Sequence, residues 1–498
     1  MEMQFDKIPV AYLQKLTGQN RTQEQTLEVR LPEGMPDIGR VLGAWGQVVV
    51  RGKEWNGDHM AVSCGVMAWV LYTPEEGEGV QSVEAWLPFS MKWDLPDARH
   101  DGKIMTSCLL KGVDARSTSA RKLMVRATIS ALGEAWLPGQ VEYAVPAGVP
   151  ESVEMLANTY PLLLPKEAGE KPFDLEDEVK LPAGPKLEKI MHYCLLPEIL
   201  DQKIMAGKVV FRGTATLHML YRAEDGKLYT HDCDLPFSQF VELEREYDRD
   251  PVVSVWPCVT ALDLELGDEG VLQLKAGLLG QYLLCDREMV TVTEDAYSPH
   301  RSVTPSYEEL LLPAVLDHIS QSLTADISQD ADVRQVVDVA FYPSYAPGEA
   351  TQAGMRFSLP GQFQMLYYDA EGQLRSLTTP WEGDWNWDIA PDATAHILLT
   401  AVGKAQAIPG AGNVTLHGEM QLYAVAGAGQ GIRMITGLEM GEPEKANPGR
   451  PSLILCRKGN RRLWDVAKEN GTTVAQIKLA NRLEGEPDDN AVLLIPVV

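Results

Sequence analysis

Alternating hydrophobic and polar positions recur along the first 435 residues of the chain and predict β-strands. In the clearest example, residues 261–266 and 271–275, every second side chain is apolar. This period of two places one set of side chains on a core face and the other on a solvent face. Polar segments containing glycine separate such stretches, as is typical of hairpin turns. The pattern therefore predicts a mainly β protein.

One strand–turn–strand pattern occurs three times at a nearly constant spacing. The copies begin at Gly65, Gly213 and Gly361, which lie 148 residues apart. Each copy contains a tyrosine and, five residues later, a glycine: Tyr72 and Gly77, Tyr221 and Gly226, Tyr367 and Gly372. A glycine there suits the positive-φ position of a hairpin loop. The shared spacing predicts three β-sandwich-like modules, at residues 1–145, 177–295 and 312–436.

Polar stretches rich in proline separate the predicted modules. Residues 144–176, 296–313 and 437–451 have this composition, which is typical of linkers. Residues 427–431 are rich in glycine and lie between two apolar stretches. We expect a hairpin turn there, because a phosphate-binding loop would have to precede a helix.

Residues 452–498 follow a different pattern. Apolar strands are expected at 453–456 and 491–497, with two helical patterns between them. The apolar positions of the helices are Leu463, Val466 and Ala467 in the first and Val474, Ile477 and Ala480 in the second. Asn470-Gly471 predicts the end of the first helix, and Thr473 with Gln476 forms a capping box for the second. The prediction is a small α+β unit of βααβ order.

The charge of the chain excludes several classes of partner. Lys and Arg number 44 against 70 Asp and Glu, which gives a net charge of −26. Phosphate backbones and anionic lipids repel such a chain, so no nucleic-acid partner is expected. Residues 452–498, with seven basic and six acidic side chains, are the exception. We find neither a signal-peptide pattern nor the roughly 18 apolar residues of a transmembrane segment, and expect a cytoplasmic protein.

No pattern of catalytic or metal-binding residues stands out. The nine histidines are scattered, without a His-x-x-x-His or Glu-x-x-His pair, and the seven cysteines are widely spaced, without a Cys-x-x-Cys. Neither a nucleophile elbow nor a Walker A loop occurs. We therefore expect a protein that is not an enzyme, with no catalytic residue, no metal site and no cofactor.

The C-terminal unit resembles a LysM domain. The resemblance lies in Lys458-Gly459, in Leu463-Trp464-Asp465-Val466-Ala467-Lys468, in Thr472-Thr473-Val474, and in Ile477, Asn481 and Leu494-Ile495-Pro496. It implies a groove for N-acetylglucosamine (GlcNAc) glycans between loops 459–462 and 482–490. The first loop is one residue longer than usual and basic, which leaves glycan and an acidic protein open as ligands. The implied binding residues are Gly459, Asn460, Arg461, Arg462, Trp464, Asn481 and Arg482; for Trp464 a core position is the alternative.

The three predicted modules resemble SPOCS domains of spore-forming Firmicutes. The first carries Pro36-Asp37-Ile38-Gly39-Arg40-Val41-Leu42, and Leu-Pro-Phe-Ser occurs at 87–90 and 235–238 but not in the third module. Three such modules followed by a LysM domain resemble the SipL-type spore morphogenetic proteins.

That resemblance implies a non-enzymatic adaptor of spore coat or envelope assembly. It would act in the mother-cell cytoplasm at the forespore surface and recruit the coat-basement ATPase, a protein of the SpoIVA type, through its LysM domain. Self-association is a further property that the resemblance suggests. The alternative is a cell-wall protein that binds peptidoglycan or other GlcNAc glycans.

Overall fold

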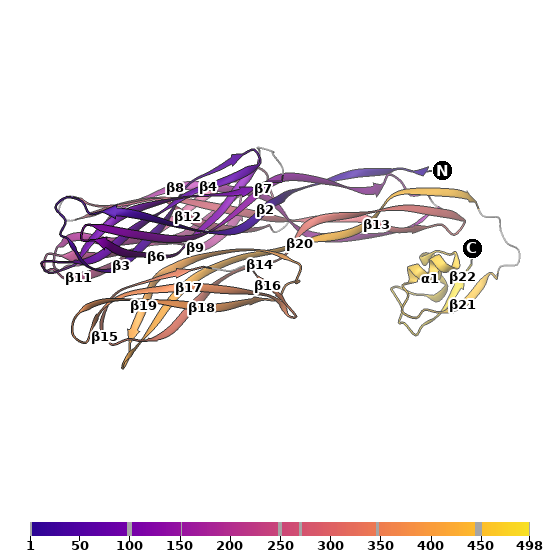
Figure 1. The fold of residues 1–498 in the computed structure, drawn as a ribbon. Coiled ribbons are helices and arrows are strands. Elements are labelled where there is room, and N and C mark those ends of the chain that lie inside the picture. The colour runs from indigo at the N-terminus through magenta and orange to yellow at the C-terminus, as the bar shows by residue number, and fades with distance from the viewer. Residues whose placement is uncertain are drawn as a thin grey trace.

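A unit of six strands occurs three times along the chain (Figure 1). The computed structural model describes residues 2–96, 102–150, 152–247, 251–267, 271–344, 348–443 and 451–497. Unit 1 comprises β2 (Phe5–Arg30), β3 (Ile38–Asn56), β4 (His59–Pro74), β5 (Gln81–Asp94), β6 (Lys103–Ser119) and β7 (Lys122–Pro146). Unit 2 comprises β8 (Glu154–Val179), β9 (Leu187–Met205), β10 (Lys208–Ala223), β11 (Leu228–Glu242), β12 (Val252–Leu266) and β13 (Leu272–Tyr297). Unit 3 comprises β14 (Arg301–Asp330), β15 (Val333–Pro343), β17 (Gly354–Asp369), β18 (Leu374–Trp387), β19 (Thr394–Pro409) and β20 (Asn413–Pro443), with the short β16 (Glu349–Thr351) beside β17. The prediction of a mainly β protein is confirmed.

Each unit consists of two antiparallel sheets. In unit 1 the strand orders are β3-β4-β5 and β2-β7-β6, and the corresponding strands of units 2 and 3 have the same order. Strand β3 lies beside β6, and β2 lies beside β5, so the two sheets of unit 1 face each other. Their inward side chains form an apolar core that includes Val62, Val66 and Ile129. Alternate residues thus supply the core, as the sequence pattern requires.

The repeated glycines occupy equivalent places in the three units. Gly65, Gly213 and Gly361 lie on the central strands β4, β10 and β17. The three glycines that close the acidic loops, Gly77, Gly226 and Gly372, have φ of 98°, 76° and 75°. The predicted positive-φ hairpin positions are therefore confirmed.

Two predictions about connecting segments are wrong. Most of 144–176 and of 296–313 belongs to the long strands β8 and β14, which are edge strands of their sheets. Proline is tolerated on an edge strand, because the free side of the strand needs no N–H donor. Residues 427–431 do not form a turn but continue β20, where they pair with β14. Residues 268–270 of one predicted turn and 444–450 of the third predicted linker lie outside the described residues.

The longest strands extend beyond the sandwiches as three two-stranded ribbons, formed by β2 and β7, β8 and β13, and β14 and β20 (Figure 1). A strand of 26 residues, such as β8, spans roughly 85 Å. The ribbons share a core to which all three contribute: Val10, Tyr143, Ala144, Leu162, Leu164, Val290, Val292, Leu310, Leu312, Ala314, Ile432 and Met434. The N-terminal β1 (Glu2–Met3) pairs with β20 in this region. The ribbons therefore form a stalk with its own apolar interior.

The three sandwiches contact one another in a cyclic order. Val80 O, directly before β5 of unit 1, accepts a hydrogen bond from Arg222 of unit 2 at 2.6 Å. Strand β18 of unit 3 accepts one at Leu374 O from Arg40 of unit 1, also at 2.6 Å. Strand β11 of unit 2 accepts one at Thr230 Oγ1 from Lys404 of unit 3, at 3.1 Å. The third strand of each first sheet thus faces the next unit, and one apolar cluster contains residues of all three units.

The C-terminal unit lies near the far end of the stalk (Figure 1). It comprises β21 (Leu453–Arg457), α1 (Leu463–Asn470), α2 (Val474–Asn481) and β22 (Val492–Pro496). Gly471 ends α1 with a φ of 61°, and Thr473 and Gln476 form the capping box of α2, both as predicted. Ala480, predicted to be on the apolar face of α2, is exposed. In the described part of the chain, no helix is long and apolar enough to cross a membrane.

Candidate functional sites

The two loops predicted to flank a ligand in the C-terminal unit are bonded to each other. The backbone N–H of Gly459 donates to Asp489 O at 2.9 Å, and Lys458 Nζ lies 2.9 Å from Asp489 Oδ1. The backbone N–H of Leu463 donates to Glu486 Oε1 at 2.7 Å. These contacts hold loop 459–462 against loop 482–490.

Arg461 and Asn481, two of the predicted binding residues, each have several bonds within the unit. Arg461 donates from Nε to Lys458 O at 3.0 Å and from Nη2 to Arg457 O at 2.6 Å, and it forms an ion pair with Glu469. Asn481 donates to Leu494 O at 2.6 Å and accepts from Leu494 N at 2.7 Å, which joins α2 to β22. The structure thus gives both side chains a role in holding the unit together.

Trp464 is buried where the C-terminal unit contacts the tip of the β8–β13 ribbon. Its indole Nε1 donates to Asp295 Oδ2 at 2.7 Å, and its ring packs edge-on against Tyr297 with the centroids 4.8 Å apart. Lys468 Nζ lies 2.7 Å from Asp295 Oδ1, and Tyr297 donates to Thr472 O at 2.9 Å. Burial alone would raise the pKa of Asp295, but the Lys468 ammonium and the Trp464 N–H outweigh it and lower the pKa. Trp464 therefore binds this chain's own stalk.

The outer surface of the C-terminal unit combines the remaining predicted residues with exposed aliphatic side chains. Asn460, Arg462 and Arg482 are exposed, and Arg462 forms an ion pair with Asp465. Gly459, half-buried, takes a φ of 61° in its loop. The exposed aliphatic side chains are Leu453, Leu455, Leu479, Val492 and Leu494. Leu453, Leu455, Val492 and Leu494 lie on one face of the β21–β22 pair, because they alternate along their strands with half-buried Ile454 and with buried Leu493 and Ile495.

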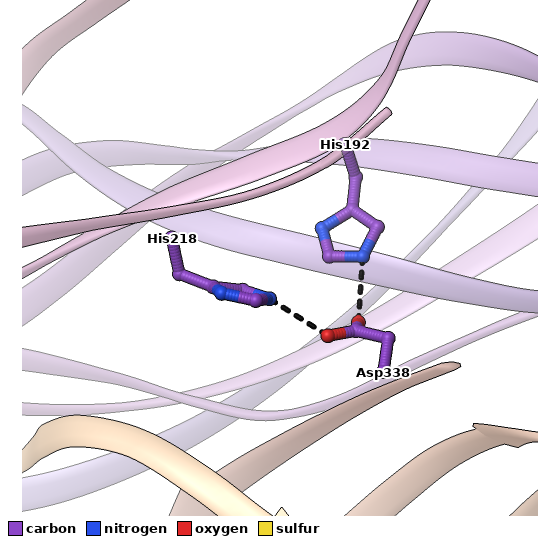
Figure 2. A group of neighbouring side chains, drawn as sticks. All are labelled: His192, His218 and Asp338. Atoms are coloured by element: carbon purple, nitrogen blue, oxygen red, sulfur yellow. Dashed lines mark hydrogen bonds and ion pairs between the residues drawn. The ribbon is translucent and has the colours of Figure 1, made fainter. Parts of the chain in front are cut away.

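A second cluster, which we call the junction cluster, consists of His192, His218 and Asp338. His192 lies on β9 and His218 on β10, both in unit 2, whereas Asp338 lies on β15 in unit 3. Figure 2 shows both imidazoles directed at the carboxylate of Asp338. The Nε2 atoms of His192 and His218 lie 2.8 and 2.7 Å from its two oxygens. All three side chains are buried.

Opposite charges compensate for the burial of the junction cluster. Burial alone would lower the pKa of His218, but the carboxylates of Asp338 and Asp232 outweigh it and raise the pKa to about 9. For Asp338, burial would raise the pKa, and the two imidazoles hold it well below its usual range instead. Burial lowers the pKa of His192. At neutral pH we therefore assign a cationic His218, an anionic Asp338 and a neutral His192.

No sequence motif marks the junction cluster, and its residues are far apart in the chain, so it was not among the predicted sites. A signal was nevertheless present in the repeat. In register, His192 and Asp338 pair with Leu220 and Leu366, the residues directly before the repeated tyrosines. Unit 1 has Gly43 at this place, paired with Leu71. Ionisable residues at equivalent positions of otherwise apolar strands could have drawn attention to the site.

Comparison with known families adds one assignment. Residues 186–266 match the family model described as SipL, SPOCS domain. No curated protein matches the chain. The SPOCS match covers β9 to β12 of unit 2 and includes His192 and His218. It indicates a sporulation-related protein and supports the SPOCS part of the resemblance. The LysM identity of residues 452–498 stays a prediction.

Proposed function

We propose that the protein is a non-enzymatic adaptor of spore coat or envelope assembly, acting in the mother cell at the forespore surface. The observation that carries this proposal is the SPOCS match within unit 2. The architecture is consistent with it, because three fused sandwiches and a common stalk provide an extended surface on which other proteins can assemble.

In this proposal the C-terminal unit acts as a LysM-type recruiting domain for a coat-basement ATPase of the SpoIVA type. Its outward surface offers exposed Leu453, Leu455 and Arg457 on one face of β21, and exposed Arg462 at the start of α1. An acidic partner with an apolar contact surface would complement this combination of side chains. Trp464 is less suitable as an anchor because it is buried against the stalk, and Arg461 because two backbone oxygens and Glu469 hold its guanidinium.

The test is recovery of the partner with the full-length protein from sporulating cells. We expect Leu455→Glu and Arg462→Glu together to abolish co-purification of the ATPase, because the first charges the apolar face and the second inverts an exposed charge of the same unit. The matched control is Leu311→Glu, which alters an exposed leucine on β14 of the stalk. Undiminished recovery with the double variant would contradict the assignment of this surface.

The same preparation separates the adaptor from a glycan-binding protein. Sedimentation with purified peptidoglycan should leave the full-length protein in the supernatant if the C-terminal unit recruits a protein. Co-sedimentation that Arg482→Glu abolishes would instead support the cell-wall alternative and reject the adaptor.

A further inference from the structure

Three ligand atoms of the kinds preferred by transition metals converge in the junction cluster. The ligand atoms of His192, His218 and Asp338 all lie within 4.8 Å of one another. Two imidazole nitrogens and one carboxylate oxygen are a ligand set for Zn²⁺ and for other divalent first-row metals. All three residues lie in the interior of paired strands, which fixes their positions.

The surroundings of His218 resemble the outer shell of a metal site. Its Nδ1 lies 2.5 Å from Asp232 Oδ1, so the carboxylate holds the proton on Nδ1. Nε2 is then the nitrogen available to a metal ion, and it is the nitrogen that faces Asp338. Lys404 Nζ lies 3.6 Å from the other oxygen of Asp232 and 3.1 Å from Thr230 Oγ1. A carboxylate that orients a histidine in this way is the usual second partner of a metal-bound imidazole.

A cavity beside the junction cluster provides space for a further ligand. It has a volume of about 150 Å³, and its lining includes His192, His218 and Trp45. This is enough for several water molecules. Trp45 stacks on His192 with the ring centroids 5.2 Å apart, and its indole N–H has no hydrogen-bond partner among the described residues. An unsatisfied buried donor in the wall makes water in this cavity favourable.

Packing between units does not itself require these ionisable groups. At the equivalent contact between units 3 and 1, the place of Asp338 is taken by Gly43, which packs closely without an ionisable group. A Cβ added to Gly43 would lie 2.8 Å from Gln364 Nε2. At the contact between units 1 and 2, Trp69 packs against Tyr193 with the centroids 4.8 Å apart. Buried ion pairs seldom stabilise a fold more than apolar residues of similar size. The contact between units 2 and 3 therefore contains ionisable groups that its packing does not require.

We propose that His192, His218 and Asp338 bind one divalent first-row transition metal ion, which joins unit 2 to unit 3. Water from the adjacent cavity completes the coordination. The ion replaces the hydrogen bonds that the two imidazoles make to Asp338. His218 keeps its Nδ1 proton, releases its Nε2 proton to solvent and binds as the neutral imidazole. This proposal is independent of the adaptor function.

Zn²⁺ and Co²⁺ are the probes, used with the full-length protein after chelator treatment. Calorimetric titration with Zn²⁺ should show one site per chain, and Co²⁺ should give the visible absorption of a site with nitrogen and oxygen ligands. Bound Zn²⁺ should also raise the midpoint of thermal unfolding, because a ligand that binds the folded state stabilises it. If the unaltered chain shows neither stoichiometric Zn²⁺ binding nor a Co²⁺ spectrum, the proposal is overturned, whatever the variants do.

The variants locate the ion. His192→Gln and Asp338→Asn should abolish the Co²⁺ spectrum, and Asp232→Asn should weaken binding by roughly 10–100-fold, as is typical of an outer-shell carboxylate. His318→Asn, at an exposed histidine of β14, should leave the affinity unchanged. If Asp338→Asn does not fold, His192→Gln and Asp232→Asn still decide the matter. Binding that these two variants leave intact would place the ion elsewhere and reject the site.

Discussion

A single missing methyl group sets how closely β9 and β10 approach each other. A Cβ added to Gly213 would lie 1.9 Å from the backbone oxygen of Glu198. Because the obstacle is backbone, no side chain can move aside to make room. Gly52 offers the opposite case, since an added Cβ there would meet no atom within 4 Å. Alanine substitutions at these two positions can therefore be compared to measure how much the close approach of β9 and β10 contributes to stability.

We expect Gly213→Ala to lower the free energy of unfolding by about 1–3 kcal/mol, the usual cost of overpacking. Gly52→Ala should change it by no more than about 1 kcal/mol. Denaturant unfolding followed by circular dichroism measures both. Equal effects of the two substitutions would show that the β9–β10 spacing is not set by this glycine.

Individual residues were predictable from the sequence where their conformation has a local cause. The glycines at 77, 226 and 372 were predictable, because a hairpin loop imposes its φ on its own residues. The junction cluster was not, since His218 and Asp338 are 120 residues apart and meet only through the packing of whole units. Trp464 is similar: its place in the C-terminal unit followed from the pattern, but its bond to Asp295 depends on the stalk.

The composition of the edge strands explains why two segments predicted as linkers are strands. Strand β8 contains Pro161, Pro165 and Pro172, and such a composition resembles a linker. Its acidic stretch is mostly exposed, because only one face of an edge strand packs on the core. The same long strands build the stalk, whose β8–β13 ribbon receives the C-terminal unit.

We predict that Asp295→Ala releases the C-terminal unit from the stalk. The variant removes the ion pair with Lys468 and leaves the Trp464 N–H without its acceptor, a loss of about 2 kcal/mol. Hydrogen exchange should become faster at the end of β13 and in α1. The control is Glu439→Ala, at an exposed acid on β20 of the same stalk.

The same contact should depend on pH. The pKa of Asp295 is lowered in the folded protein, so its contribution is complete above the ordinary carboxyl value of about 3.9. It is lost as the pH falls through the lowered pKa. On acidification, the protection of the α1 amides relative to their intrinsic exchange rate at each pH should fall, and in Asp295→Ala it should already be low at neutral pH. A pH response that the substitution leaves unchanged would contradict this.

The three units share their interior. One apolar cluster contains Trp45 of unit 1, Leu217 of unit 2 and Leu366 of unit 3. The stalk adds a second cluster to which all three units contribute. Unfolding of any one unit would expose apolar surface on the other two, which favours unfolding of all three in a single step.

Leu217→Ala should therefore lower the unfolding temperature of all three units together. Removal of a fully buried leucine typically costs about 2–5 kcal/mol. Differential scanning calorimetry of the full chain should show one main transition that moves as a whole. A transition that splits, with only one part displaced, would mean that the units unfold independently.

Gly43, His192 and Asp338 occupy equivalent positions in units 1, 2 and 3, and the cyclic order of the units affects which residues these positions can hold. In a ring assembled from three identical polypeptides, any residue at that place would appear three times, and three aspartates or three histidinium ions would repel one another. Because the three units here belong to one polypeptide, the residue at this position can change in one unit alone. An acidic residue can therefore contact a basic residue at just one of the three contacts between units. Tandem duplication thus permits a single cluster of charged residues at one contact in a nearly symmetric ring of three units. Because all three units belong to one chain, every molecule contains each residue of the cluster once.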